Sequence, residues 1–264
     1  MMNDMMDLSP EDSEALRQAK SLLEHSSLAV KITSIIGIPI EKGLALLPTK
    51  WSEVVNSATR IALEQALNVA LLTVDDTGTR TSSNRVHKLA VAASGAAGGL
   101  FGLPALAIEL PVSTTVMLRS IADIARSEGE RLATPEAKLA CLEVFAFGGP
   151  AQRDDAAKAG YFAIRASLAR AVSEAAQHLA QRGIAQEGAP AIVRFITQVA
   201  SRFGVTVSEK LAAQAVPMIG AVGGALINSV FIDHFQDMAR GHFIIRRLER
   251  TYNPELVKHA YDES

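Results

Sequence analysis

The side chains of this chain that could do chemistry are ionisable and amide groups set inside apolar sequence. Glu109 is flanked by apolar residues, Arg119 and Asp123 are four residues apart, and Asn228 interrupts a run without charges. A buried charge needs a partner and a buried amide needs hydrogen bonds. Either these side chains satisfy one another across the helices, or they line a polar spot in an apolar cavity. In the second case Glu109, Arg119, Asp123 and Asn228 would bind the head group of a lipid-like ligand.

Other reactive residues give weaker signals. The six histidines include no His-x-x-x-His pair, so a zinc site has no local support. The segment from Asp233 to Asp237 is the best metal-like cluster, although a solvated or ion-paired helix surface is the simpler interpretation. Cys141 has no base beside it, which favours a buried small residue over a catalytic thiol. Phosphate-loop, dinucleotide and nucleophile-elbow motifs are missing, and we predict no catalytic residue, metal or cofactor.

Composition limits the class of protein. The 264 residues are 48% hydrophobic and 20% charged, with a formal net charge of −2. This apolar content is enough for a large core, and the balanced charge argues against a nucleic-acid partner. A single cysteine rules out a disulfide framework and favours a reducing, intracellular setting. The first 14 residues lack the basic start and apolar run of a secretory signal, so we expect a cytoplasmic protein.

Nearly every segment shows the three- and four-residue apolar spacing of an α-helix, and none shows a convincing strand alternation. Caps and breakers set the expected boundaries. We expect a loop over 75–84 and helices over 9–25, 28–51 with a break near Pro39, 52–74, 85–101, 103–127, 134–147, 153–182, 189–203, 206–214 and 218–251.

Two stretches, 89–108 and 211–232, contain no charged residue and no histidine, and each is long enough to cross a bilayer. Both contain glycines four residues apart, which let helix backbones approach closely in membranes and in soluble cores: Gly95/Gly99, Gly98/Gly102 and Gly220/Gly224. Missing aromatic belts and the interrupting prolines favour buried helices. We therefore predict an all-α, multi-helix bundle with two central glycine-rich helical hairpins, over 85–127 and 210–252.

The apolar stripe over 28–51 has two interpretations. It is an ordinary core-facing helix, or it lies on a membrane surface. In the second case Trp51 would lie at the level of the head groups, with Lys31, Lys42 and Lys50 near anionic lipids.

Several segments resemble the bacterial EcsC family. They are KLA at 210–212, VPMIGAVGGALIN at 216–228, RRLERTY at 246–252, the segment from Ala96 to Ala125, and CLEVFAFG at 141–148. The resemblance covers roughly residues 30–255 and implies a helical bacterial protein that works near the membrane, because the family is named after a protein encoded beside an ABC transporter. It implies no catalytic residue; Glu109, Asn228 and Arg247 match polar positions of its motifs.

These observations give one leading hypothesis. We expect an N-terminal extension over 1–26, an EcsC-like helical domain over 27–255 and a C-terminal tail over 256–264. The protein would be a non-enzymatic, membrane-proximal accessory of a transport or envelope process, cytoplasmic or peripheral on the inner face of the membrane. Its partner would be a lipid, another apolar small molecule or a membrane transporter subunit.

Two alternatives from other classes stay open. One is an intracellular hydrolase or metal-dependent enzyme, in which Glu109, Asp123, Asp233, His234 or His242 converge in one cleft. The other is a small integral membrane protein, in which the two charge-free stretches span the bilayer.

Overall fold

A computed structural model describes residues 8–24, 27–37, 39–73, 103–149, 160–182, 189–215 and 220–264. All regular structure in these ranges is helical, which confirms the all-α prediction. The elements are α1 (Pro10–Glu24), α2 (Leu28–Ile36), α3 (Ile40–Leu44), α4 (Trp51–Thr73), α6 (Leu103–Ser127), α7 (Pro135–Glu143), the 3-10 turn η1 (Val144–Ala146), α8 (Tyr161–Arg182), α9 (Pro190–Gln214), α10 (Gly220–Thr251) and α11 (Pro254–Glu263).

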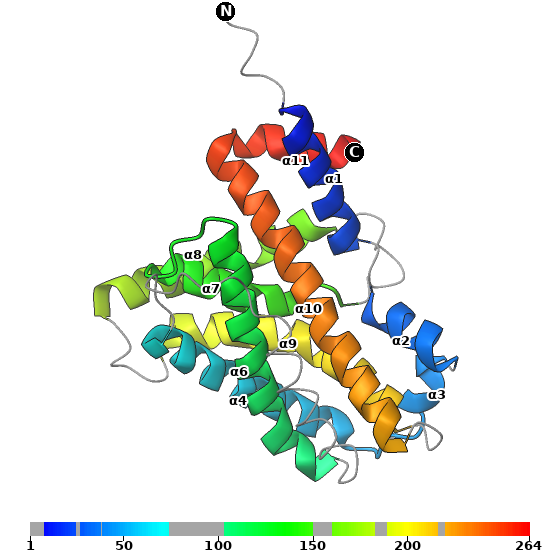
Figure 1. The fold of residues 1–264 in the computed structure, drawn as a ribbon. Coiled ribbons are helices and arrows are strands. Elements are labelled where there is room, and N and C mark those ends of the chain that lie inside the picture. The colour runs from blue at the N-terminus through cyan, green and yellow to red at the C-terminus, as the bar shows by residue number, and fades with distance from the viewer. Residues whose placement is uncertain are drawn as a thin grey trace, which may run out of the picture.

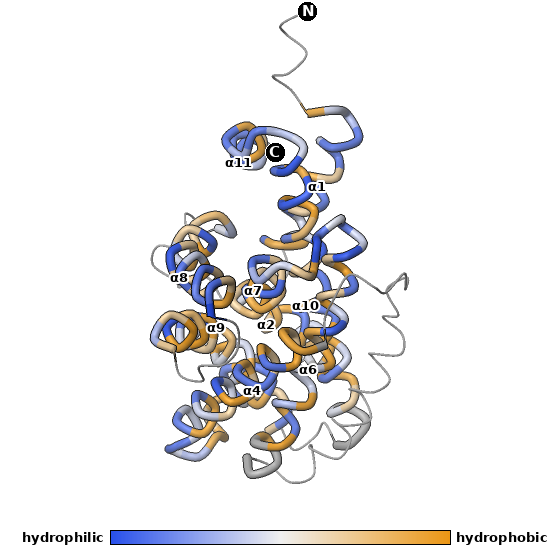
Figure 2. The backbone as a smooth tube through the Cα atoms, turned by 90° about the vertical axis from the view of Figure 1, so that its left-hand side faces the viewer, coloured by the Kyte–Doolittle hydropathy of each residue, from blue (hydrophilic) through white to orange (hydrophobic). Residues whose placement is uncertain are grey.

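The helices form two layers around a small central element (Figure 1). In the front layer the long helix α10 runs diagonally, with α1 beside its upper half, α2 beside its lower half and α6 running alongside it on the other side. Behind them α4 and α8 each pack against α9, and the turned view shows these three helices as a separate stack (Figure 2). The α7–η1 segment lies between the layers and contacts both. It therefore occupies the centre of the core.

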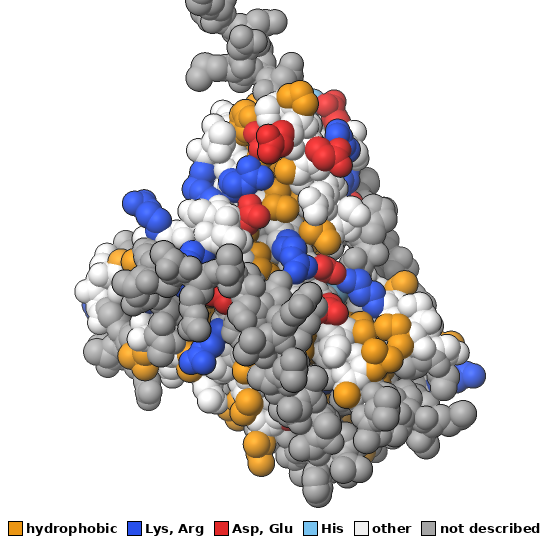
Figure 3. Space-filling view, in the orientation of Figure 1, with side chains coloured by type: hydrophobic (Ala, Val, Ile, Leu, Met, Phe, Trp, Pro, Cys, Tyr) orange, Lys and Arg blue, Asp and Glu red, His pale blue; other side chains and the backbone are white. Residues whose placement is uncertain are grey.

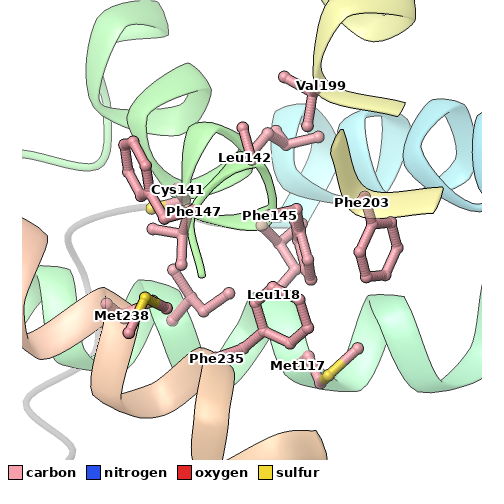
Figure 4. Packing of buried hydrophobic residues seen from close by; sticks show 14 of the residues in the cluster. Met117, Leu118, Cys141, Leu142, Phe145, Phe147, Val199, Phe203, Phe235 and Met238 are labelled. Atoms are coloured by element: carbon pink, nitrogen blue, oxygen red, sulfur yellow. The ribbon is translucent and has the colours of Figure 1, made fainter. Parts of the chain in front are cut away.

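Aromatic side chains fill that centre. Phe145 of η1 lies between Phe203 of α9 and Phe235 of α10, with ring centroids 4.9 and 5.3 Å away (Figure 4). Phe231, one turn before Phe235, continues the cluster at 5.2 Å. Such tilted and edge-on contacts stabilise ring pairs beyond their buried area. The apolar residues of both layers thus meet on a single turn of 3-10 helix.

Local signals explain most helix boundaries. Ser27 caps α2 by accepting from the Val30 N–H, and Thr134 caps α7 by accepting from the Ala137 N–H, with proline in the first turn of α7. Gly37, at φ 68°, ends α2 in the left-handed conformation that glycine favours, and α3 begins after Pro39. The expected break near Pro39 is therefore confirmed.

Two boundaries differ from expectation. The predicted break at Gly204 is wrong, because α9 continues through it from Pro190 to Gln214. Gly204 packs against α4, where an added Cβ would lie 3.3 Å from Asn56 Oδ1, and the buried stripe continues on both sides of it. Tertiary packing therefore outweighs the low helix propensity of glycine. The expected C-terminal tail over 256–264 is mostly helical, because residues 254–263 form α11. Asn253 caps this helix, and its residues Val257 and Tyr261 are buried.

Close backbone contacts occur between helix pairs other than the predicted ones. A Cβ added to Gly43 of α3 would lie 2.0 Å from the Ala212 carbonyl oxygen of α9. A Cβ added to Gly241 of α10 would lie 3.0 Å from the Ala19 carbonyl oxygen of α1. Glycine at these two positions allows the helix backbones to touch.

The two predicted glycine hairpins are not observed as such. Gly95, Gly98, Gly99 and Gly102 lie outside the described residues. The charge-free run over 211–232 is divided, because α9 ends at Gln214 and α10 begins at Gly220. Among the helices that the structure describes, none combines the length and the apolar character that a membrane span requires.

We predict that Gly43→Ala destabilises the protein by about 2–3 kcal/mol, because its methyl group would collide with the backbone of α9. Gly149→Ala is the matched control, since its Cβ would make an ordinary 3.8 Å contact with Thr206 Oγ1. Urea unfolding monitored by circular dichroism measures both. Equal free energies of unfolding for the two variants would contradict the close packing of α3 on α9.

Candidate functional site

Glu109 has a partner inside the bundle. Its Oε1 on α6 lies 2.7 Å from Nζ of Lys210 on α9, and the two side chains are 8% and 1% exposed. The Lys210 ammonium also lies 5.0 Å from the centre of the Phe231 ring on α10. The pair thus joins three helices of the two layers. Sequence reasoning missed Lys210, although this cation comes directly before the second charge-free run.

The other three predicted ligand-binding residues are spread along two helices. Asn228 is fully buried on α10, whereas Arg119 is exposed. Arg119 lies ten residues after Glu109 on α6, which is about 15 Å along the axis. Asp123 accepts a hydrogen bond from Arg126 at 2.8 Å. The structure therefore does not bring Glu109 and Arg119 together at one point of α6.

A second set of polar side chains joins α8 to α10. Arg165 donates to both oxygens of Glu249, at 2.8 and 3.0 Å. It also donates to the Tyr161 hydroxyl at 3.2 Å, and that hydroxyl lies 2.8 Å from Nδ1 of His242. Arg165 can only donate, so the Tyr161 oxygen accepts this bond. The contact between the hydroxyl and Nδ1 then links the His242 imidazole to the same group. Sequence reasoning named His242 as a candidate but missed its partners Tyr161, Arg165 and Glu249, since nothing local marks them.

The protonation states of these groups suit structure better than catalysis. Burial lowers the pKa of His242 well below its usual value, and the Arg246 and Arg165 charges lower it further. Burial also raises the pKa of the Tyr161 hydroxyl and raises the pKa of the Cys141 thiol to about 12. All three groups are therefore neutral near pH 7. A neutral, enclosed thiol is unreactive, in line with the interpretation of Cys141 as a core residue.

Glu143 is a buried carboxyl whose pKa lies in the neutral range. It ends α7 and is 5% exposed. Burial raises its pKa from 4.5 to about 7, although the charges of Arg165 and Arg246 oppose the rise. This carboxyl therefore changes its charge in the neutral range.

Pairs of opposite charges follow the outer side of α10 (Figure 3). Arg246 binds Glu130 through two hydrogen bonds, at 2.8 and 3.2 Å. Arg247 donates to Glu128 at 2.9 Å and to Asp12 of α1 at 3.1 Å. These contacts hold α1 and the α6–α7 connection against α10.

The metal-like segment of α10 has other partners. Asp237 accepts from Lys31 of α2 at 2.7 Å and from Arg240 at 3.0 Å. His234 is fully buried, and a Cβ added to Gly148 would lie 2.2 Å from its Nε2. Within the described ranges, no three His, Cys, Asp or Glu side chains are grouped so as to hold a metal ion. In this part of the chain, the side chains that the metal-enzyme alternative would bring into one cleft are therefore not grouped as a metal site.

Exposed aliphatic side chains occur along the segment that contains α2 and α3. Val30 is 65% exposed, Ile35 45% and Leu46 56%, and Lys42 and Lys50 are also exposed. We call these five residues the α2–α3 surface. Figure 3 shows hydrophobic side chains on the face beside α2 and the lower half of α10. The other two predicted membrane-contact residues are engaged elsewhere: Lys31 binds Asp237, and Trp51 packs partly buried against the core.

The comparison with protein families decides the relationship of the chain. The model of the EcsC protein family matches residues 11–248. The chain belongs to the EcsC family. Comparison with curated proteins and with solved structures gives no significant match. The EcsC match runs from the first turn of α1 to the last turn of α10 and leaves α11 outside.

The three EcsC motif positions noted in the sequence lie in the packed part of the fold. Glu109 binds Lys210, and Arg247 joins Glu128 and Asp12. Asn228 is enclosed on α10. Glu109 and Arg247 therefore each link separate parts of the fold, and Asn228 lies in its interior.

We predict that Lys210→Met destabilises the protein by about 3–5 kcal/mol, because it leaves Glu109 buried without its cation. The double variant Glu109→Leu/Lys210→Met should recover most of this loss, since an apolar pair of similar size needs no partner. Denaturant unfolding of the two single variants and the double variant gives the coupling energy. A loss below about 1 kcal/mol for Lys210→Met would contradict a buried pair.

We predict that Glu143→Gln gains stability relative to the wild type as the pH rises. The folded state keeps Glu143 protonated up to about pH 7, whereas the unfolded carboxyl ionises near 4.5. Wild-type stability is therefore lost between these two values, and glutamine removes the loss. The difference between the two proteins should shift by about 2–3 kcal/mol between pH 5 and pH 8.

Urea unfolding at the two pH values measures this shift. Glu136→Gln is the control, because Glu136 is an exposed glutamate of the same helix. A Glu143→Gln difference that is the same at both pH values would show that Glu143 is ionised in the folded protein.

Proposed function

We propose that this EcsC protein is a peripheral membrane protein without enzymatic activity, which touches an anionic lipid surface through its α2–α3 surface. The observation that carries the proposal is that Val30, Ile35 and Leu46 are exposed in the same segment of chain as two exposed lysines. The transfer of exposed aliphatic side chains from water into the head-group region is favourable in free energy. The negative surface potential of anionic lipids attracts lysines in the same segment.

The fold presents this surface on a short, braced segment. The inner side chains Leu28 and Ile32 are 0% and 1% exposed and anchor α2 in the core. Gly43 fixes α3 directly on the backbone of α9. Val30 and Leu46 are therefore held outward by packing on the opposite side, which lowers the entropic cost of membrane contact.

The expected affinity is modest. Burying an aliphatic side chain fully contributes about 1.5–3 kcal/mol, and each lysine near an anionic surface adds about 1 kcal/mol. Three partly exposed side chains and two lysines support reversible binding rather than permanent anchoring. Reversible binding suits an accessory of a membrane transport or envelope process, which is the role that we propose for this chain.

Vesicle flotation tests the proposal. Wild-type protein should float with vesicles that contain phosphatidylglycerol, and less with pure phosphatidylcholine. Leu46→Asp should weaken binding about tenfold, because it replaces an inserting side chain with a charge that the lipids repel. Higher salt should also weaken binding, because it screens Lys42 and Lys50.

Leu72→Asp is the matched control. Leu72 is 74% exposed, but it lies at the other end of α4, about 30 Å along that helix from Trp51. Its replacement should leave flotation unchanged. The proposal fails if the wild type stays at the bottom with anionic vesicles, or if both variants lose binding equally.

A further inference from the structure

Helix α2 is the least extensively held part of the α2–α3 surface. It has nine residues and packs against α9 and α10. Gly37 follows it in the left-handed conformation, and an added Cβ there would meet no atom within 4 Å. Two polar contacts supplement the apolar anchors: Lys31 binds Asp237 of α10, and a carboxylate oxygen of Glu209 accepts a hydrogen bond from the Ala29 N–H.

Glu209 is the unusual member of this arrangement. Its side chain comes from α9 and lies under the first turn of α2, and the residue is only 6% exposed. Its other oxygen, Oε2, has no hydrogen-bond partner within the described ranges. Removing an ionised carboxylate from water is unfavourable when only one hydrogen bond replaces the lost solvation. The protonated, neutral carboxyl does not carry this penalty.

The charged groups on the surrounding elements do not offset that cost. Lys31 is bound to Asp237, and Lys210, the neighbour of Glu209 on α9, is bound to Glu109. Other titratable groups on helices that pack against α9 include Glu41 and Lys42 of α3, Glu53 of α4, and Asp233 and His234 of α10. Burial raises the pKa of Glu209 from 4.5 to about 7, and only the bond from Ala29 opposes the rise.

We propose that Glu209 is a proton-operated latch that controls how firmly α2 docks on α9. The protonated carboxyl stays enclosed beneath α2. The ionised carboxylate favours contact with water, which it gains when α2 moves away. This movement also frees Leu28 and Ile32, the inner side chains of α2, for contact with lipid, a consequence that rests on the proposed function.

Proton linkage gives the size of the effect. The docked state has a Glu209 pKa of about 7, and a solvated glutamate has the ordinary value of 4.5. The equilibrium for opening α2 should therefore rise about tenfold between pH 6 and pH 8, because the open state binds fewer protons.

Hydrogen exchange of the full-length protein, followed by mass spectrometry of a peptide that covers α2, tests the latch without any lipid. After correction for the intrinsic pH dependence of exchange, protection of α2 in the wild type should fall about tenfold from pH 6 to pH 8. Glu209→Gln should abolish this fall, since glutamine keeps the acceptor and never ionises. Glu53→Gln, an exposed glutamate of α4, should behave like the wild type.

Two results would overturn the latch. One is α2 protection in the wild type that does not change with pH. The other is a change that persists in Glu209→Gln, which would assign the proton to another group. Flotation at pH 6 and pH 8 then separates the two proposals: pH-dependent exchange without vesicle binding would reject the membrane function and leave the latch intact.

Discussion

The enclosure of α10 by other helices is the constraint on which the structure depends. This helix packs against α1, α2, α6, α9 and α11, and apolar side chains such as Phe231, Phe235 and Phe243 are fully buried on it. A helix enclosed in this way must also satisfy its polar residues. Gln236 donates to Ser120 of α6 at 2.8 Å, and His242 meets Tyr161 of α8. The polar interior of the protein is thus largely the set of partners that α10 requires.

The polar residues of the interior therefore have structural partners, whereas the function that we propose belongs to the surface. Glu109, His242 and Cys141 are the kinds of residue that invite a catalytic interpretation. In the structure the first binds Lys210, the second is a neutral imidazole hydrogen-bonded to Tyr161, and burial raises the pKa of the third to about 12. The surface around α2 and α3 is different, because Val30 of α2 and Leu46, just after α3, remain exposed to water. Glu209 connects the two regions, since it lies inside while its partner, the Ala29 N–H, belongs to the surface helix.

The helices could be predicted from the sequence because their signals are local. Ser27 and Thr134 cap the helices that they precede, and the break at Gly37 and Pro39 follows from glycine and proline geometry. The continuity of α9 through Gly204 could not be predicted, because it depends on packing against α4. Side-chain partners were equally inaccessible: Glu109 and Lys210 are 101 residues apart, and Arg165 and Glu249 are 84 apart. The exposure of Leu46 also follows only from knowing which sides of the helices are covered.

The central claim is that the α2–α3 surface enters the head-group layer, and site-specific fluorescence tests it most directly. Cys141 is enclosed and its pKa is raised by burial, so a polarity-sensitive thiol dye will label a newly introduced cysteine selectively. We expect dye at Leu46→Cys to shift to shorter wavelength and brighten on addition of phosphatidylglycerol vesicles, whereas dye at Leu72→Cys does not change. An unchanged signal at Leu46→Cys, or equal shifts at both positions, would contradict the account.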